Sequence, residues 1–333
     1  MVSHRLFTLQ IKDLFTANKG MDRCLKLAAL AAASDVPALV LGETGTGKTL
    51  LAQAIHNSSK RARGAFISFN ASAMSDTLLE SQLFGHERGA FTGAQKAVKG
   101  KFELADAGTL FFDEVADMSP LAQAKILRAI EYGQFERLGS ERPLHSNARI
   151  ISATNLNLRQ AIRNGKFRED LYHRLAGLTL HIPPLRDRPE DLPGLIAVEL
   201  DSAARAAGKN VTSIHSSAMR MLLDYAWPGN LRELHHTLRS IVLLTDGHEV
   251  LPEHVAFDPE SYSNDDTTAA RVTSADIPAP AQDRDLSLSH AIRKHIVYVL
   301  SQCDGSQRQA ARMLGISRSR LARHLKAGNG AAT

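Results

Sequence analysis

The sequence predicts an α/β protein with a parallel, doubly wound sheet, followed by a smaller helical part. Short apolar runs alternate with amphipathic stretches over the first half of the chain. The run at residues 38–41 leads directly into a glycine-rich loop at 42–49, and a helical stretch follows. The run at 109–112 ends in two carboxylates, Asp113 and Glu114. Such alternation favours parallel strands with helices on both faces and a ligand at the carboxyl ends of the strands.

The expected elements follow from hydrophobic periodicity and from the residues that begin and end helices. Strands are expected at residues 38–41, 66–69, 109–112, 149–153 and 178–182. Helices in the same part are expected at 21–33, 48–60, 77–84, 120–131 and 167–175. After Pro183 and Pro184 the strand patterns stop, and we expect only helices, at 191–207, 216–225 and 230–244.

Composition shifts divide the chain into regions. Residues 258–285 contain seven acidic residues against two arginines, with Pro278, Pro280 and few large apolar side chains. Such a segment cannot bury enough apolar surface to fold alone, so we interpret it as a linker. The expected regions are a short N-terminal segment (1–19), the α/β part (20–182), the helical part (183–257), the linker (258–285) and a C-terminal helical part (286–333).

Bulk composition limits the functional classes. The chain has 333 residues and a net charge of +5, with a pI of about 9.2, so nucleic acid is a candidate partner. Cys24 and Cys303 lie far apart without a Cys-x-x-Cys pattern, which is typical of idle thiols in a reducing compartment. No apolar stretch approaches the length of a membrane span, and the N-terminus lacks a signal core. We therefore expect a cytoplasmic protein without a membrane partner.

The loop at 42–49 fits the phosphate-binding pattern G-x-x-x-x-G-K-[ST] in its required strand–loop–helix context. Backbone N–H groups of such a loop surround phosphates, and the helix N-terminus adds positive charge. Lys48 can reach the β- and γ-phosphates, and the Thr49 hydroxyl can bind Mg²⁺. The alternative is an ordinary turn before a lysine, which the flanking elements disfavour. The nucleotide-binding set is Gly42, Glu43, Thr44, Gly45, Thr46, Gly47, Lys48 and Thr49.

Two further groups suit phosphoryl transfer. Asp113 can hold Mg²⁺ through water, and Glu114 can polarise the attacking water, although an acidic turn after a strand is the alternative interpretation. Arg168 and Arg174, six residues apart on the expected helix 167–175, are candidates for an arginine presented to a neighbouring subunit. Surface arginines are common, so the residues alone leave that role open. For Arg232 and Asn155, too, the residues alone leave a role at the nucleotide open.

Residues 85–96, GHERGAFTGAQK, resemble the loop that marks bacterial enhancer-binding activators of sigma-54 RNA polymerase. Other segments agree in order and spacing: 42–49, 66–70, 113–114, 153–155, 167–175, 185–188 and 227–234. The resemblance covers about residues 20–258. It implies an AAA+ ATPase with a helical lid at 183–257, using ATP and Mg²⁺. It also implies a ring, usually a homo-hexamer, built from single chains or from dimers.

The resemblance implies roles for individual residues. Asn70 would hold Glu114 until the nucleotide state releases it. One departure is Thr49, where this family commonly carries glutamate; threonine is the general choice and should preserve Mg²⁺ binding. The other implied roles are a sensor (Thr154 and Asn155), arginines presented to the neighbour's nucleotide (Arg168 and Arg174) and a second sensor on the lid (Arg232).

The loop at 89–94 has two glycines bracketing Ala-Phe-Thr, which predicts a flexible tip that displays Phe91 and Thr92 to a partner. A simple surface turn with Phe91 folded beneath it is the alternative. The resemblance implies contact with sigma-54 through Gly89, Ala90, Phe91, Thr92, Gly93 and Ala94.

The C-terminal part predicts DNA binding. A helix at 306–315 closes at Gly315, and a second follows at 318–326, with six Lys or Arg and no acidic residue between 305 and 326. This pattern favours a helix-turn-helix, and it resembles the Fis type, although a solvated basic helix pair is the alternative. The expected contacts to double-stranded enhancer DNA are Arg308, Ser317, Arg318, Ser319, Arg320 and Arg323.

The resemblance implies an ATP-hydrolysing activator that binds upstream enhancer DNA and remodels sigma-54 RNA polymerase closed complexes to permit promoter opening. Only some 20 residues precede the ATPase part, too few for a regulatory domain. This resembles the phage-shock type, which a separate inhibitor protein restrains in trans. Two alternatives are a replication initiator or helicase loader, and a DNA-binding repressor that senses ATP. The 89–94 loop disfavours the first; Asp113 and Glu114, with the paired arginines, disfavour the second.

Overall fold

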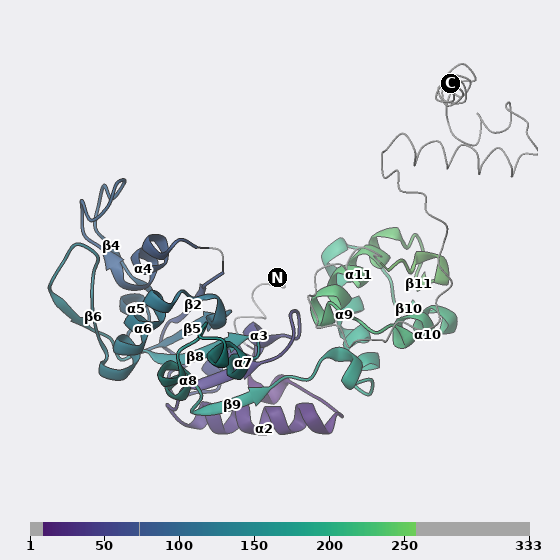
Figure 1. Ribbon diagram of the computed structural model, residues 1–333. Helices are drawn as coiled ribbons and strands as arrows, with labels where there is room; N and C mark the ends of the chain where they lie inside the picture. The colour runs from purple at the N-terminus through teal and green to yellow at the C-terminus, as the bar shows by residue number, and fades with distance from the viewer. Residues whose placement is uncertain (1–8, 73, 258–333) are drawn as a thin grey trace, which may run out of the picture. The chain divides into compact units, whose positions relative to one another are not determined.

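A five-stranded parallel sheet forms the centre of the α/β part (Figure 1). The computed structural model describes residues 9–72 and 74–257, and structural statements below concern these residues. The strand order is β2–β5–β8–β1–β9. The bounds are Phe66–Asn70 for β2, Thr109–Asp113 for β5, Arg149–Thr154 for β8, Ala38–Leu41 for β1 and Leu178–His181 for β9. All predicted strands are present, which confirms the predicted α/β class.

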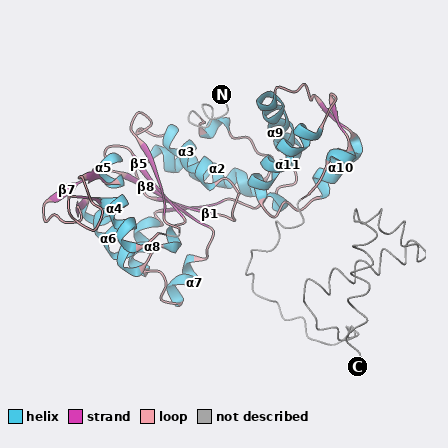
Figure 2. Ribbon diagram, turned by 90° about the horizontal axis from the view of Figure 1, so that it is seen from above, coloured by secondary structure: helices cyan, strands magenta, loops and turns pink. Residues whose placement is uncertain are grey.

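Helices cover both faces of the sheet (Figure 2). Alternation along β5 shows how the faces differ: Phe111 belongs to one hydrophobic core, and Leu110 and Phe112 belong to the other. The Phe111 core includes helices α2 (Lys19–Ala33) and α3 (Lys48–Asn57). The opposite core includes α4 (Asp76–Phe84), α5 (Lys101–Leu104), α6 (Pro120–Tyr132), α7 (Leu158–Arg163) and α8 (Glu169–Leu175).

A separate hydrophobic core belongs to the helical lid. Trp227 is fully buried there, and its indole N–H donates to the Leu222 carbonyl at 2.9 Å. The lid helices are α9 (Leu192–Ala207), α10 (Ser216–Asp224) and α11 (Asn230–Leu244). The prediction that strands stop after Pro184 is wrong in one detail, because β10 (Ser213–Ile214) and β11 (Glu249–Val250) form a short parallel pair. Two-residue strands are too short to show an alternating pattern.

Two antiparallel hairpins project from the α/β part, and the sequence did not predict either. One pairs β3 (Gly85–His86) with β4 (Val98–Lys99), and the other pairs β6 (Gln134–Glu136) with β7 (Pro143–His145). Their strands are short and largely polar, so they lack the apolar runs that identified the central sheet. The short helices that the prediction also missed are α5, α7, η1 (Ile11–Asp13), η2 (Val115–Asp117), η3 (Leu185–Asp187) and η4 (Pro252–His254).

Other sequence expectations have mixed outcomes. Helix α3 ends at Asn57 rather than at residue 60. Cys24 is buried, and desolvation raises the pKa of its thiol to about 11, as expected for an idle cysteine. Cys303, the linker and the C-terminal helices lie outside the described residues. Within the described part, no helix is both long and apolar enough to span a bilayer.

Phe111→Ala should lower the free energy of unfolding by about 3–5 kcal/mol, because it removes a fully buried aromatic ring from β5, which lies between β2 and β8. Urea denaturation followed by circular dichroism measures this. The matched control is Phe15→Ala, since Phe15 is 90% exposed and its loss should change stability by at most about 0.5 kcal/mol. Equal effects of the two substitutions would contradict the assignment of Phe111 to the core.

Candidate nucleotide site

The strand order brings the predicted site residues to one edge of the sheet. Each strand runs in the same direction, so the loops that follow β1, β8 and β5 emerge side by side. In this register Leu41, just before the glycine-rich loop, pairs with Thr154, and Asn70 pairs with Asp113. The edge therefore collects the phosphate loop, the two carboxylates and the predicted sensor, as expected for a ligand site on a parallel sheet.

The loop at 42–49 has the backbone that phosphate binding requires. Gly45 and Gly47 have φ values of 80° and 99°, in the left-handed region that side chains rarely adopt. Thr46 is buried, and its hydroxyl donates to the Glu43 carbonyl at 2.8 Å, which fixes the turn. Lys48 is the first residue of α3, so the loop leads into a helix N-terminus where anions are favoured.

The Lys48 ammonium lies inside this loop. Its Nζ donates to the carbonyls of Gly42 at 3.0 Å and Glu43 at 3.4 Å. It also forms an ion pair with the Glu114 carboxylate at 3.3 Å. The side chain is only 6% exposed, so these contacts hold the charge in the concave part of the loop. A phosphate bound there would compete with Glu114 for the same cation.

Glu114 has an unusual backbone. Its φ of 51° and ψ of 53° place it in the left-handed region, which is uncommon for a residue other than glycine and is often found at functional sites. Its carboxylate accepts a hydrogen bond from the Asn155 backbone N–H at 3.2 Å. The Asn155 carboxamide in turn donates to the Thr44 hydroxyl at 3.1 Å. Asn155 therefore contacts both the phosphate loop and Glu114.

The expected contact between Asn70 and Glu114 is not made in this structure. Strand β5 lies between β2 and β8, so Glu114 can turn toward either neighbour. It turns toward Asn155, after β8, while the Asn70 side chain accepts from the Ser72 backbone N–H at 2.8 Å. The sequence could not decide between the two, because Asn70 ends one neighbour of β5 and Asn155 follows the other.

Thr49 and Asp113, the predicted magnesium ligands, lie close to each other. The Thr49 hydroxyl lies 3.4 Å from the Asp113 carboxylate. Mg²⁺ is usually held in such sites by one or two protein oxygens together with phosphates and water, so a hydroxyl and a carboxylate at the mouth of a phosphate loop fit it. No cluster of three His, Cys, Asp or Glu side chains occurs in the described part of the chain, so a fully protein-ligated metal site is not found there.

The two candidate arginines are exposed but differ from expectation in one respect. Helix α8 begins at Glu169, and Arg168 is its N-cap with extended backbone, so the two arginines do not share a helical face. The Arg168 guanidinium is held by both carboxylate oxygens of Asp170, at 3.0 and 2.7 Å. Arg174 makes a long contact of 3.4 Å with the Glu131 carbonyl. Both side chains are available to a neighbouring molecule.

The lid contacts the phosphate loop through residues to which the sequence assigned no role. The Arg186 guanidinium holds the Glu43 carboxylate at 2.5 and 2.7 Å and keeps the pKa of that carboxyl below its usual value. Asn230, fully buried, donates to Glu43 at 3.3 Å and to the Thr44 carbonyl at 3.1 Å. Both residues lie in segments that carried the family resemblance, which was the available signal.

Arg232 also lies beside the phosphate loop. A Cβ added to Gly45 would come within 2.2 Å of the Gly229 carbonyl oxygen and 3.2 Å of the Arg232 Cβ. Glycine at position 45 is thus required by the approach of the lid as well as by its φ. The Arg232 side chain is exposed near the loop, a position compatible with the predicted second sensor.

The 89–94 loop extends from the β3–β4 hairpin. Gly89 and Gly93 have φ values of 83° and 106°, and a Cβ at either would meet nothing within 4 Å. Thr92 is exposed, as predicted, whereas Phe91 is half-buried and packs edge-on against His86 with ring centroids 5.0 Å apart. The tip therefore displays the hydroxyl fully and the aromatic ring only in part.

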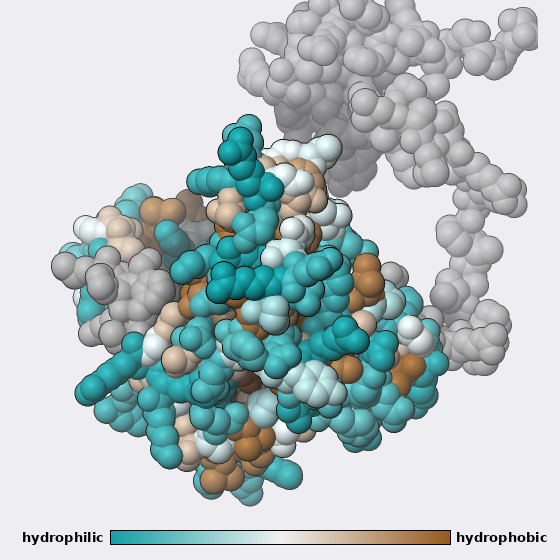
Figure 3. Space-filling view, turned by 90° about the vertical axis from the view of Figure 1, so that its left-hand side faces the viewer, coloured by the Kyte–Doolittle hydropathy of each residue, from teal (hydrophilic) through white to brown (hydrophobic). Residues whose placement is uncertain are grey.

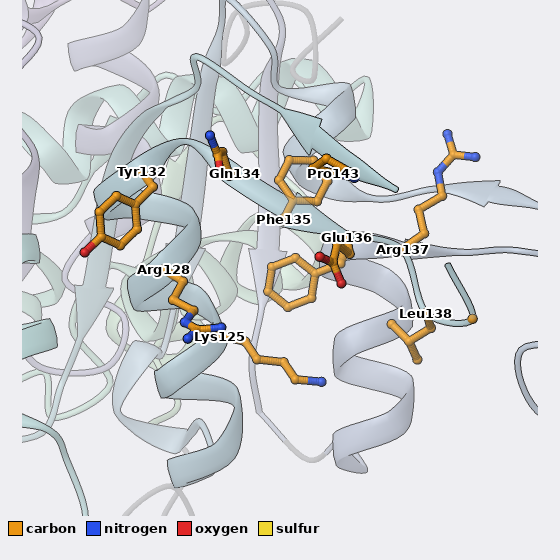
Figure 4. A pocket seen from close by; sticks show the side chains of 11 residues that line it. Lys125, Arg128, Tyr132, Gln134, Phe135, Glu136, Arg137, Leu138 and Pro143 are labelled. Atoms are coloured by element: carbon orange, nitrogen blue, oxygen red, sulfur yellow. The ribbon is translucent and has the colours of Figure 1, made fainter. Parts of the chain in front are cut away.

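An ion pair connects the base of this hairpin to the second hairpin. Arg137 lies next to β6 and binds Glu87 at 2.9 Å and Glu103 at 2.7 Å. A cavity of about 700 Å³ lies beside it, lined by cations, aromatic rings and hairpin residues and sharing no residue with the phosphate loop (Figure 4). Figure 3 shows the face at the left of Figure 1, where β4 and β6 lie; it is mostly hydrophilic, with small scattered hydrophobic areas.

Comparison with known families covers most of the chain. The Sigma-54 interaction domain matches residues 14–181, and the AAA+ ATPase lid domain matches residues 186–272. The Fis family of bacterial regulatory proteins matches residues 293–328, which include all the predicted DNA contacts and lie outside the described residues. These matches confirm the predicted fold class, including the lid and the C-terminal helix-turn-helix.

Individual relatives agree with these matches. The chain is 42% identical over 288 residues to the Nif-specific regulatory protein of Azotobacter vinelandii, covering 85% of this chain and 52% of that protein. It is 39% identical over 326 residues to the DNA-binding transcriptional regulator NtrC of Escherichia coli K12, covering 94% and 70%. The crystal structure of NtrX from Brucella abortus with ADP superposes with a TM-score of 0.72 at 31% identity, covering 98% and 71%. The chain spans about half the length of the Nif-specific regulatory proteins that it matches.

Asn230→Ala should lower the thermal stability of the protein and loosen the lid from the phosphate loop. The change leaves the Leu185 N–H and the Thr44 carbonyl without their partner, at a cost of about 1–3 kcal/mol. Differential scanning calorimetry measures the thermal stability. The release rate of a fluorescent ADP analogue reports how firmly the lid is held against the phosphate loop. Asn210→Ala, at an exposed lid position, is the control. Unchanged melting and ADP release in Asn230→Ala would contradict the bridging role.

Proposed function

The chain belongs to the sigma-54 interaction family of AAA+ ATPases, and on this premise we propose that it is an ATP-hydrolysing transcriptional activator. It binds upstream enhancer DNA and remodels sigma-54 RNA polymerase closed complexes to permit promoter opening, and it works in the cytoplasm. The observation that carries the proposal is the 89–94 loop, displayed on a hairpin of the same subdomain that holds the phosphate loop.

Hydrolysis is assigned to the edge of the sheet. The phosphates of ATP bind within the 42–49 loop, and Lys48 contacts the β- and γ-phosphates. Thr49 and Asp113 would hold Mg²⁺, which would supply positive charge to the transferred phosphoryl group. Lys48 pairs with Glu114 at 3.3 Å, and a phosphate that takes over Lys48 frees the carboxylate to polarise water. Asn155 keeps the freed carboxylate near the loop and senses the nucleotide together with Thr154.

Active sites are completed between subunits of a ring, which we propose to be a homo-hexamer. Arg168 and Arg174 are exposed, and their hydrogen bonds go to Asp170 and to the Glu131 carbonyl rather than to the phosphate loop, so a neighbour's nucleotide is the target that we assign to them. An arginine supplied in this way stabilises charge that develops during phosphoryl transfer. Arg232, beside Gly45, reports the same nucleotide to the lid, and Asn70 binds Glu114 in another nucleotide state.

Coupling to the polymerase is assigned to the two hairpins. Thr92 at the exposed tip and Phe91, half-buried against His86, contact sigma-54, with Gly89 and Gly93 as the pivots of the loop. Arg137 joins the base of this hairpin to the second one, so the pair moves as one body. DNA binding falls to the Fis-type region, with Arg308, Ser317, Arg318, Ser319, Arg320 and Arg323 as contacts.

Lys48→Ala should abolish ATP binding, whereas Glu114→Gln should bind ATP and hydrolyse it very slowly. Lys48 contacts the phosphates in the ground state, while Glu114 acts mainly on the attacking water. Equilibrium binding of a fluorescent ATP analogue and steady-state phosphate release separate the two effects. Near-normal turnover of the Glu114→Gln protein would overturn the role of this carboxylate.

Thr92→Ala should keep ATP hydrolysis largely intact but lose transcription from a sigma-54 promoter. The Thr92 hydroxyl lies on an exposed loop whose residues are absent from the phosphate site, so it has no task in phosphoryl transfer. In vitro transcription with ATP or a non-hydrolysable analogue measures the coupling. Gln95→Ala, at the exposed position directly after the 89–94 loop, is the control that should transcribe normally.

Binding to sigma-54 gives a second readout of the same proposal. ADP–aluminium fluoride mimics a planar γ-phosphate and should trap wild-type protein, but not Thr92→Ala, on sigma-54. If wild-type protein fails to activate transcription with hydrolysable ATP, the activator function is wrong. Normal transcription by Thr92→Ala would instead show that the loop is only a surface turn.

A further inference from the structure

Gln123 is a polar side chain buried in the core beneath α6. It has no exposed surface, and it lies one turn into the helix, among Ala122, Ile126 and Ala129 on the buried face. Glutamine is mostly found at the surface of proteins, because an amide removed from water must satisfy all its hydrogen bonds. A buried glutamine on an otherwise apolar face therefore calls for a physical explanation.

The Gln123 carboxamide is fully paired with backbone groups. Its Nε2 donates to the Met118 carbonyl at 2.8 Å and to the Lys166 carbonyl at 2.9 Å. Its Oε1 accepts from the Arg168 backbone N–H at 2.8 Å. Both amide hydrogens and the carbonyl oxygen are thus used, and each partner belongs to a segment outside regular secondary structure.

These contacts join the two ends of the proposed phosphoryl-transfer machinery. Met118 ends the short segment that begins at Glu114 and continues through η2. Lys166 and Arg168 flank Phe167, which is buried in the same core, and Arg168 is the N-cap that precedes α8. One side chain therefore spans from the segment after the proposed catalytic carboxylate to the segment that presents the proposed trans-acting arginine.

Arg168 needs such a support because its own helix does not fix it. Its backbone is extended, and its guanidinium is exposed except for the pair with Asp170. Asp170 sets the direction of the side chain, whereas the hydrogen bond from the Arg168 N–H to Gln123 sets the position of the backbone. An arginine that must reach a phosphate in another subunit loses effect when it is misplaced by about 1 Å.

We propose that Gln123 is a positioning residue for phosphoryl transfer: it fixes Arg168 for the neighbouring subunit's nucleotide and ties that position to the segment following Glu114. The inference rests on the proposed role of Arg168. It assigns to Gln123 an effect on turnover in the adjacent subunit, with little effect on the affinity of its own phosphate loop, which it does not touch.

The test is a double-mutant cycle with the full-length protein at ring-forming concentration. Gln123→Met keeps the length of the side chain but removes all three hydrogen bonds. It should lower kcat by about 10- to 100-fold, with the Kd for a fluorescent ATP analogue changed less than about twofold. In the Arg168→Ala protein, the same substitution should lower the residual kcat by less than about twofold, because both changes act through one group. Radiolabelled ATP makes this low residual turnover measurable.

Two further variants keep the test interpretable. The side chain in Gln123→Glu has nearly the same size and can still accept from the Arg168 N–H, but it places a carboxylate against two carbonyls. If Gln123→Met does not fold, Gln123→Glu should show the same non-additive loss of kcat. Gln160→Met, at an exposed position of α7, should retain wild-type turnover. Thermal unfolding of each variant verifies that the protein is folded.

The outcomes separate the inference from the function on which it rests. If Arg168→Ala hydrolyses ATP normally, the proposed trans-acting role of Arg168 is wrong, and the proposed role of Gln123 is wrong as well. If Arg168→Ala is impaired but folded Gln123 variants turn over normally, only the inference is overturned. Equal losses from Gln123→Met on both backgrounds would mean that Gln123 merely stabilises the fold, and this too would overturn it.

Discussion

The parallel register of β1, β8 and β5 is the constraint on which the candidate site depends. Because these strands end at the same edge, the phosphate loop, Asn155 and Glu114 meet although they are far apart in the sequence. The central position of β5 between β2 and β8 leaves Glu114 two neighbours to which it can turn. In the structure Glu114 has a left-handed backbone and turns toward Asn155, and its carboxylate also pairs with Lys48.

Buried amides connect this edge to the parts of the molecule that must respond to it. Asn230 joins the phosphate loop to the start of η3 and the lid, and Gln123 joins the segment after Glu114 to Arg168. An amide suits such a junction because it donates and accepts at once without bringing an unpaired charge into the core. Charged pairs occur instead where the groups are partly exposed, as between Arg186 and Glu43.

The hairpins place the 89–94 loop away from the nucleotide edge without detaching it from the α/β part. Arg137 holds two carboxylates, one at the base of the loop and one on α5, in a partly exposed setting where ion pairs can exchange. The glycines of the loop have open space around them, so their φ values rather than packing require glycine. The loop is closed on itself by a hydrogen bond from the Gly89 N–H to the Ala94 carbonyl at 2.9 Å.

The sequence by itself determined the sheet, the phosphate loop and the identity of the residues at its edge. Apolar runs and the G-x-x-x-x-G-K-T spacing are local signals, and parallel strands bring their carboxyl ends together whatever the details of packing. Only the tertiary structure decided that Glu114 turns to Asn155 rather than Asn70, that Arg168 precedes α8, and that Gln123 and Asn230 bridge distant segments. These choices depend on hydrogen bonds between groups remote in sequence, which no local pattern encodes.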